Sequence, residues 1–486
     1  MRPRWLLALA VLLLAGPARP ASVDLVEAAR RGDLAAVRDL LEAGTGAGDV
    51  NAPGGDGMTA LLWACQANDV ELARTLLAAG ADPNLPNRFG ITPLWVAAIN
   101  RNAPLAELLL EHGAEVNGAL PHGETALMAA ARAGDVATIR VLLRAGADPN
   151  ASETSLGETG LMWAAAEDHP DAIRALVEGG ADPNAHSRVL DLLPMNWEQT
   201  GMVSTVLPSG GWTALMLAAR QGSRAAARAL VEMGADLDAQ DPDGTTALAI
   251  AIMNAHYDLA AELLEAGADP NVADRTGVNA LYAAVDMATL GREIGRPARP
   301  NRDERDAHDL VRLALAHGAN PNAQLTEPAI PRHHGFPDRT LGAGTTALMR
   351  AARGLDMESM RVLLEAGADP MLTQADGATA VFVLAGALRP FVGGVGDVDT
   401  DRTREALRLL LDAGVDVNAR AANGETALHR AARLGNAAFV TLLVANGARV
   451  DARDDEGRTA LDIVTTPGRG FNESVAALLR SLAESQ

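Results

Sequence analysis

Lysine is absent from the 486-residue sequence, so arginine supplies all 41 of its fixed positive charges. Aspartate and glutamate together number 62, which leaves a formal net charge of −21 at pH 7. A surface of this sign repels the phosphate groups of nucleic acids and of anionic lipids. The composition therefore argues against binding to nucleic acid or to a membrane surface as the main function.

Cysteine and aromatic residues are also scarce. The single cysteine, Cys65, has no second cysteine with which to form an internal disulfide. Its surroundings, LLWACQAN, are largely apolar and predict a buried thiol rather than a reactive one. Aromatic residues make up 3% of the chain and hydrophobic residues 48%, so we expect a core built mainly from alanine, leucine and valine.

Long apolar runs are absent except near the N-terminus. There, MRPR precedes the run WLLALAVLLLAG, and small residues that suit cleavage after Ala18 or Ala21 follow it. The run is shorter than the roughly 20 residues that a membrane-spanning helix needs. We therefore interpret residues 1–21 as a secretory signal peptide, and expect residues 22–486 in the periplasm or outside the cell, without membrane insertion. An uncleaved N-terminal anchor is the alternative.

Common catalytic motifs are missing as well. The sequence has no H-E-x-x-H zinc motif, no nucleophile elbow, no phosphate-binding loop and no paired cysteines. His333 and His334 are adjacent, but neighbouring side chains rarely point the same way, and no third ligand lies at metal spacing. We therefore expect no enzymatic activity, no metal and no cofactor. A hydrolase or metal site within an insertion is the remaining alternative.

What the sequence does contain is a repeated segment. GETALMAAARAGDVATIRVLLRAGADPN (123–150) recurs, for example as GMTALLWACQANDVELARTLLAAGADPN (57–84) and as GETALHRAARLGNAAFVTLLVANGARVD (424–451). One threonine, or asparagine in one copy, marks each recurrence, and most steps between markers are 33 or 34 residues. The markers are Thr59, Thr92, Thr125, Thr159, Thr213, Thr246, Asn279, Thr346, Thr379, Thr426 and Thr459.

Each copy predicts two short helices. The marker threonine suits a helix N-terminus, and small apolar residues such as Ala130 and Ala131 allow close packing of helices. A break at Gly134 precedes a second stretch with apolar residues at helical spacing, and Gly146 ends it. One such pair cannot bury its own apolar face, so consecutive copies must stack around a continuous core.

The recurring signature G-x-T-[AP]-L-x-x-A-A…LL-x-x-G-A-[DE]-[PV]-N resembles that of the ankyrin-repeat family. The resemblance covers residues 22–486 and implies an all-α solenoid of about 12 helix-turn-helix units with β-hairpin-like connections. It also implies a protein partner, because hairpin tips and first helices line a concave binding groove in that family. The first copy lacks the Gly-x-Thr entry and the last ends in polar residues, so we interpret both as caps.

Four insertions rich in glycine, proline or charge interrupt the array, near residues 188–209, 288–306, 325–343 and 388–402. The first contains RVLDLLPMNWEQTGMVSTVLPS, which is too apolar for a solvated linker. It must pack either on the array itself or on a partner, since large exposed apolar patches are uncommon on monomers. The sequence leaves both alternatives open.

Two patterns supply candidate partner-binding residues. Tryptophan is a frequent binding anchor, although such rings also fill gaps between helices. Arginine recurs directly after Ala-Ala, which suggests a ladder in the groove, although arginine near a helix C-terminus is also favourable in itself. The residue just before each marker, which we call the tip residue, varies between copies and favours one irregular partner surface. The candidates are Trp63, Trp95, Trp163, Trp197, Trp212, Arg132, Arg220, Arg353 and Arg433.

These observations predict a non-catalytic protein–protein interaction scaffold. We expect it to be exported, monomeric, and bound to a protein partner through the groove, the tips and the insertions. The absence of lysine beside abundant alanine and arginine is typical of a bacterium with a GC-rich genome. The alternative is an accessory, inhibitor or chaperone-like subunit of a periplasmic enzyme, such as a redox enzyme, whose activity would change on binding.

Overall fold

The computed structural model describes residues 24–43, 49–190, 210–290, 300–328, 340–386, 400–466 and 472–485. They fall into two compact units, which we describe separately. Unit 1 runs to Ser155 and includes Glu178–Gly180, and unit 2 comprises Leu156–Val177 and the chain from Ala181 onward. The described residues form 24 α-helices and a few isolated β-bridges.

Unit 1 contains the first eight helices. They are α1 (Leu25–Arg30), α2 (Leu34–Ala43), α3 (Ala60–Gln66), α4 (Val70–Ala78), α5 (Pro93–Ile99), α6 (Ala103–Glu111), α7 (Ala126–Ala133) and α8 (Val136–Arg144).

Unit 2 contains the other helices, apart from the last residue of α10. They are α9 (Gly160–Ala166), α10 (Pro170–Glu178), α11 (Ala214–Gln221), α12 (Arg224–Glu232), α13 (Ala247–Met253), α14 (Tyr257–Glu265), α15 (Ala280–Ala288), α16 (Ala307–Ala316), α17 (Ala347–Arg353), α18 (Met357–Glu365), α19 (Ala380–Ala385), α20 (Thr400–Asp412), α21 (Ala427–Arg433), α22 (Ala437–Ala445), α23 (Ala460–Thr465) and α24 (Glu473–Ser485).

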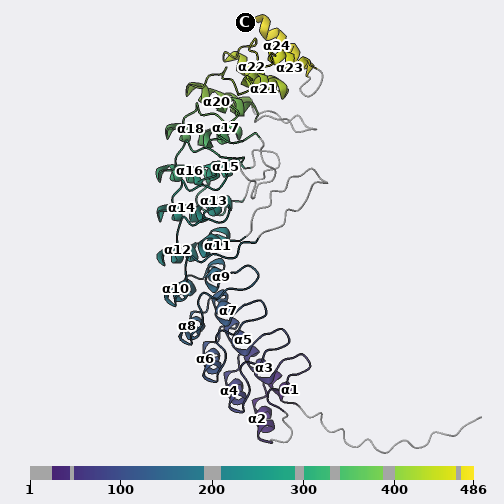
Figure 1. Ribbon diagram of the computed structural model, residues 1–486, viewed down its shortest axis with the longest axis vertical. Helices are drawn as coiled ribbons and strands as arrows, with labels where there is room; N and C mark the ends of the chain where they lie inside the picture. Colours follow the sequence, from purple (N-terminus) through teal and green to yellow (C-terminus); the bar gives the residue numbers. More distant parts are fainter. Residues whose placement is uncertain are drawn as a thin grey trace, which may run out of the picture. The chain divides into compact units, whose positions relative to one another are not determined.

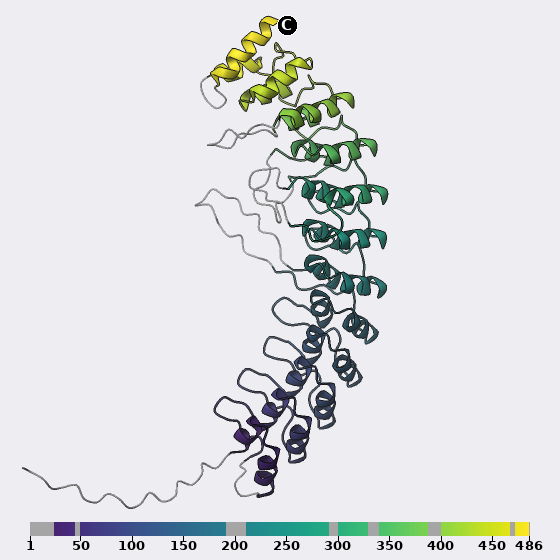
Figure 2. The ribbon, with the colours of Figure 1, turned by 180° about the vertical axis from the view of Figure 1, so that it is seen from behind.

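Successive helices pair, odd with even, and we number the pairs as repeats 1 to 12. Within each unit the pairs form two rows of helices (Figures 1 and 2). First helices of neighbouring repeats pack together, as α3 does with α5, and second helices do the same, as α14 does with α16. The predicted all-α architecture of about twelve helix pairs is therefore confirmed.

Small buried side chains bring the first helices close together. Ala64, Ala97 and Ala130 are all fully buried, as are the second-helix residues Leu109 and Leu142. Cys65 lies in the same layer, and its burial raises the pKa of the thiol to about 12. The prediction that Cys65 is core filler rather than a reactive thiol is thus confirmed.

Polar side chains define where each helix begins. The hydroxyl oxygen of Thr59 accepts a hydrogen bond from the backbone N–H of Leu62 at 3.2 Å, which satisfies a donor that the helix leaves unpaired. Asn279 replaces threonine at the start of α15 and does the same, since its side-chain oxygen accepts from the N–H of Tyr282 at 2.9 Å. The substitution of the marker residue therefore preserves the cap.

Asparagines link one repeat to the next. The side chain of Asn84 donates to the carbonyl of Gly113 at 3.0 Å, and its oxygen accepts from the N–H of Glu115 at 2.7 Å. We call this set of contacts the asparagine ladder. Its other members with both bonds are Asn51, Asn117, Asn184, Asn271, Asn322 and Asn418. Met371 takes this position in repeat 9 and has no side-chain amide to form the bonds.

The tips of the repeats are tight turns rather than extended hairpins. In repeat 3, the N–H of Asn87 donates to the carbonyl of Ile91, and the N–H of Gly90 donates to the carbonyl of Asn87. Gly90 adopts a φ of 81°, which favours glycine. In the described chain, β-bridging at the tips consists of isolated pairs such as Ala119 with Thr125, so the predicted hairpin-like connections are short.

Several predicted features lie wholly or partly outside the described residues. The signal peptide at residues 1–21 does so entirely, and so does Trp197. Of the four predicted insertions, the structure describes residues 188–190, 288–290, 300–306, 325–328, 340–343 and 400–402. Among the described helices, none combines the length and the apolar character that crossing a membrane requires.

Candidate partner-binding face

In three repeats, the tip residue and the arginine eight positions after it contact each other. In repeat 4, the guanidinium of Arg132 lies 2.9 Å from the carboxylate of the tip residue Glu124. In repeat 11, Arg433 forms the same ion pair with the tip residue Glu425. Eight residues span little more than two helical turns, so a long arginine side chain can run back along the first helix to the tip. We call these contacts tip–end pairs.

The equivalent arginines make other contacts, with the tip residue in repeat 6 and with Thr340, five residues before the tip residue Thr345, in repeat 9. The guanidinium of Arg220 lies 5.1 Å from the ring centroid of the tip residue Trp212, within the range of cation–π attraction. In repeat 9, Arg353 donates to the hydroxyl of Thr340 at 3.0 Å. All four candidate arginines therefore contact the tip region of their own repeat.

One candidate tryptophan joins a tip–end pair of the next repeat. The indole N–H of Trp95, on α5, donates to the carboxylate of Glu124 at 3.2 Å. The same carboxylate oxygen accepts from Arg132. Trp95 is half-buried and the side chain of Glu124 is 16% exposed. The sequence candidates Trp95 and Arg132 are thus brought together through the tip residue of repeat 4.

Trp63 and Trp163 occupy equivalent positions, four residues after their marker threonines, and both are half-buried. The indole N–H of Trp163 donates to its tip residue Glu158 at 2.8 Å. The tip residue of the equivalent repeat is Met58, and the buried indole nitrogen of Trp63 has no hydrogen-bond partner. The tip residue therefore decides whether the indole N–H of a tryptophan at this position has a hydrogen-bond acceptor.

A hollow of about 440 Å³ opens between the first helices of repeats 10 and 11. Phe382 and Arg430 form one part of its lining, with the guanidinium 4.7 Å from the ring centroid. Arg433 and Glu425 form another part. Burial, together with the positive charge of Arg458, lowers the pKa of the Arg433 guanidinium from its ordinary value. The lining of the hollow thus combines two arginines and two acidic residues with an aromatic ring.

The sequence comparison of copies missed one informative position. The fourth residue after the marker holds Trp63 and Trp163, but it also holds Arg350 and Arg430. Arg350 is fully buried, and it donates to the carboxylate of Asp286 on α15 at 2.6 Å. Tabulating this position across the copies would have revealed that large side chains share it.

Two other predictions concern residues that the structure does not describe. Trp197 lies outside the described residues, and so do His333 and His334. Within the described ranges, no group of three or more histidine, cysteine, aspartate or glutamate side chains could hold a metal ion.

Comparison with known proteins identifies one family. The model of the family described as ankyrin repeats (three copies) matches residues 25–119, 118–187, 186–274 and 399–484, which together exceed half of the chain. No curated protein matches the sequence. Residues 275–398 lie outside the family match, yet α15 to α19 within them continue the alternation of first and second helices.

Proposed function

The chain belongs to the ankyrin-repeat family, and from that premise we propose that it is a protein-binding scaffold whose partner docks on the tips and first helices. The family predicted from the repeat signature is thereby confirmed. Ankyrin repeats generally mediate protein–protein interaction, and proteins built from them are typically non-catalytic.

The tip–end pairs are the observation that supports the tips and first helices as the binding face. The arginine side chains remain 40% exposed at Arg132 and 42% exposed at Arg433, whereas their partners are 16% exposed at Glu124 and 4% exposed at Glu425. A guanidinium that is already held by a buried carboxylate loses little side-chain entropy when a partner packs against it. The pairs therefore present ordered cationic groups at the tips.

The chemistry of these pairs differs from repeat to repeat. The arginine contacts a glutamate at the tip in repeats 4 and 11 and a tryptophan at the tip in repeat 6. In repeat 9 it contacts Thr340, which lies outside the tip position. A partner made of identical units would favour identical contacts. The variation supports one irregular protein surface as the partner.

We also propose that residues 1–21 direct export and are removed, which leaves residues 22–486 in the periplasm or outside the cell. The proposal rests on the basic start and the apolar run that follows it. Fractionation of cells that express the full chain, with intact mass measurement of the product, tests it. A product that keeps residue 1 and stays in the cytoplasm would contradict it.

The binding proposal is tested by proximity labelling in the exported compartment, followed by affinity measurement with the partner that is captured. The test variant is Arg132→Ala combined with Arg433→Ala. Its matched control is Arg174→Ala combined with Arg361→Ala, because these arginines also form ion pairs but lie on second helices. We expect the test variant to weaken binding about tenfold, as loss of interface anchors does, and the control to bind as wild type.

Two results would change this proposal. Equal loss of affinity in both variants would show that the tips are not part of the binding face. Recovery of no partner at micromolar concentration would contradict a scaffold function altogether. If the captured partner is a single enzyme whose rate changes on binding, the protein is instead an accessory or inhibitor subunit of that enzyme.

A further inference from the structure

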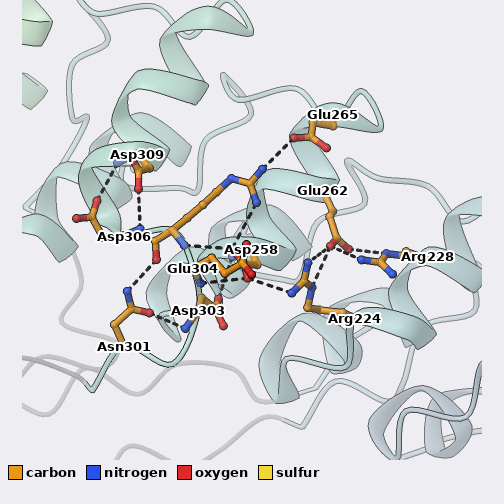
Figure 3. Close-up of polar contacts among 11 residues, drawn as sticks. Arg224, Arg228, Asp258, Glu262, Glu265, Asn301, Asp303, Glu304, Asp306 and Asp309 are labelled. Atoms are coloured by element: carbon orange, nitrogen blue, oxygen red, sulfur yellow. Dashed lines mark hydrogen bonds and ion pairs between the residues drawn. The ribbon is translucent and has the colours of Figure 1, made fainter.

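Ion pairs join the second helices of neighbouring repeats in unit 2. Figure 3 shows one network, in which Arg224 and Arg228 of α12 both reach Glu262 of α14. Arg224 also lies 3.0 Å from Asp258, and Arg305, just before α16, lies 3.4 Å from that same carboxylate. Arginine stays protonated throughout the range in which proteins fold, so these contacts do not respond to pH between about 6 and 9.

Most other ion pairs that connect second helices in the described residues also use arginine. They are Arg38–Glu71, Arg174–Glu232, Arg312–Glu358 and Arg361–Glu405. One connection differs, because its cationic partner is a histidine. His308 of α16 faces Asp356, the residue that precedes α18.

The contact between His308 and Asp356 is close and largely shielded from water. The Nε2 atom of His308 lies 3.0 and 3.1 Å from the two carboxylate oxygens of Asp356. The Asp356 side chain is 1% exposed and that of His308 is 17% exposed. Ser359, in the first turn of α18, donates to the same carboxylate at 2.6 Å. A buried carboxylate is stabilised more by a charged donor than by a neutral one, so the protonation state of His308 matters here.

The charged groups around His308 all favour its protonated form. Asp356 and Glu358 face it from α18, and Asp306 lies at the start of its own helix. The nearest arginine on α16, Arg312, is engaged by Glu358 and Asp309. On the other side, the carboxylates of α14 are engaged by arginines, as described above. With lysine absent and Cys65 buried, histidine is the side chain whose ordinary pKa lies closest to the range from pH 6 to 9.

We propose that His308 and Asp356 form a proton-dependent latch between repeats 8 and 9, closed when His308 is charged and loosened when it is neutral. The latch is a property of the fold and does not depend on the proposed binding function. Its consequence is that α16 and α18 are held together more tightly in mildly acidic medium than in alkaline medium. An exported protein meets such changes in pH directly, because its surroundings follow the external medium.

The direction of the pH effect follows from linkage. The hydrogen bond to Asp356, together with the negative charges nearby, raises the pKa of His308 above its usual value of 6.5. The contribution of the latch is therefore complete below the unfolded-state pKa, and it is lost as pH rises through the raised folded-state pKa. The loss falls on the alkaline side of 6.5, which separates it from carboxylate titration at low pH.

Hydrogen exchange measured on the full mature chain at pH 6.0 and pH 8.5 tests the latch. After correction for intrinsic exchange rates, we expect protection factors in α16 and α18 to fall about tenfold at the higher pH, the effect of one charge-assisted hydrogen bond. Helices α12 and α14 provide the internal control, because arginines join them. Their protection factors should stay unchanged.

Two substitutions identify the residue responsible. His308→Gln should give low protection in α16 and α18 at both pH values. His256→Gln should keep the wild-type pH dependence, because the ring of His256 bonds to the backbone carbonyl of Arg220. If His308→Gln prevents folding, titration of the His308 ring by NMR in wild type and in Asp356→Asn replaces it. The pKa of His308 should fall toward 6.5 in Asp356→Asn. Unchanged protection between the two pH values, or an unchanged pKa in Asp356→Asn, would overturn the proposal.

Discussion

Two tryptophans in equivalent positions differ in their hydrogen bonding because their tip residues differ. Trp163 donates to Glu158, whereas the indole nitrogen of Trp63 is buried without a partner beside the tip residue Met58. Leaving a buried donor unpaired costs free energy of about 1–3 kcal/mol. The protein is therefore less stable at Trp63 than it could be, and a single substitution at the tip should raise its free energy of unfolding.

Replacing Met58 with glutamate should stabilise unit 1. The new carboxylate would accept from the indole of Trp63, as Glu158 does from Trp163, and we expect a gain of about 1 kcal/mol in the free energy of unfolding. Urea denaturation measures this gain. The same substitution in a Trp63→Phe background should bring no gain, since the donor is then absent. A gain of equal size in both backgrounds would show that the hydrogen bond is not its source.

His429 should respond to pH in the direction opposite to His308. Its ring nitrogens lie 3.2 Å from the backbone N–H of Thr426 and 3.1 Å from the carbonyl of Arg458, which suits a neutral ring. Burial lowers its pKa below 6.5, so its contribution to stability is present above pH 6.5 and is lost as pH falls through the lowered value. We expect the stability difference between wild type and His429→Gln to shrink between pH 7.5 and 5. A constant difference would contradict this account.

At the scale of secondary-structure elements, the asparagine ladder ties the end of one repeat to the end of the next through two backbone hydrogen bonds. Repeat 9 has Met371 at the ladder position, and this side chain is 51% exposed. The helices on either side still pack together, because α18 contacts α20. The step between repeats 9 and 10 thus relies on side-chain packing where most other steps also have an asparagine.

Met371→Asn should therefore add a ladder contact. Its amide would donate to the carbonyl of Gly414 and accept from the N–H of Asp416, by analogy with Asn322 at the preceding step. We expect a gain of about 1–2 kcal/mol, as two hydrogen bonds would give. The complementary variant Asn322→Met should lose a similar amount. Thermal or urea unfolding followed by circular dichroism measures both, and equal stability of the two variants would argue against the ladder as a stabilising element.

At the scale of the whole molecule, contacts run mainly between neighbouring repeats, so cooperativity is carried from each repeat to the next. The six tryptophans all lie between residues 5 and 212, whereas the helices extend to residue 485. Fluorescence therefore reports on the N-terminal part of the chain, and circular dichroism reports on all of it. The two signals can separate if unfolding is not a single transition.

We expect urea unfolding curves from tryptophan fluorescence and from circular dichroism to have different midpoints. A quasi-one-dimensional array does not require distant repeats to unfold together. A tryptophan placed at Phe439 in α22, which is buried, would extend the fluorescence signal to the C-terminal repeats. Coincident midpoints for all probes would show instead that the array unfolds as one cooperative body.

The repeat signature was sufficient to predict the helix pairs and their caps. Even Asn279, which departs from the signature, begins its helix as the threonines do. Contacts within one repeat follow from a fixed spacing, but the latch joins residues 48 positions apart, where the usual step is 33 or 34. This separation could not be read from the repeat period without knowing how residues 325–343 interrupt the chain between them.

The candidate site was predictable only in part, for a related reason. Tip residues and arginines were recognised as two separate patterns, because sequence alone does not show that Arg132 bends back to Glu124. The unpaired indole nitrogen of Trp63 could not be predicted either, because it depends on the methionine at the tip, which has no carboxylate to accept a hydrogen bond. Side-chain direction and hydrogen-bond partners are three-dimensional facts that a repeat pattern does not contain.

The missing ladder contact at Met371 has a mechanical consequence. When the chain is stretched from its two ends, force passes from repeat to repeat, and backbone hydrogen bonds at each step resist separation. The step between repeats 9 and 10 lacks the two asparagine bonds found at the step before it, formed by Asn322. Under tension this step should part before the steps that have both asparagine bonds, so that repeat 10 detaches from repeat 9 while Asn271 and Asn322 still tie repeats 7 to 9 together.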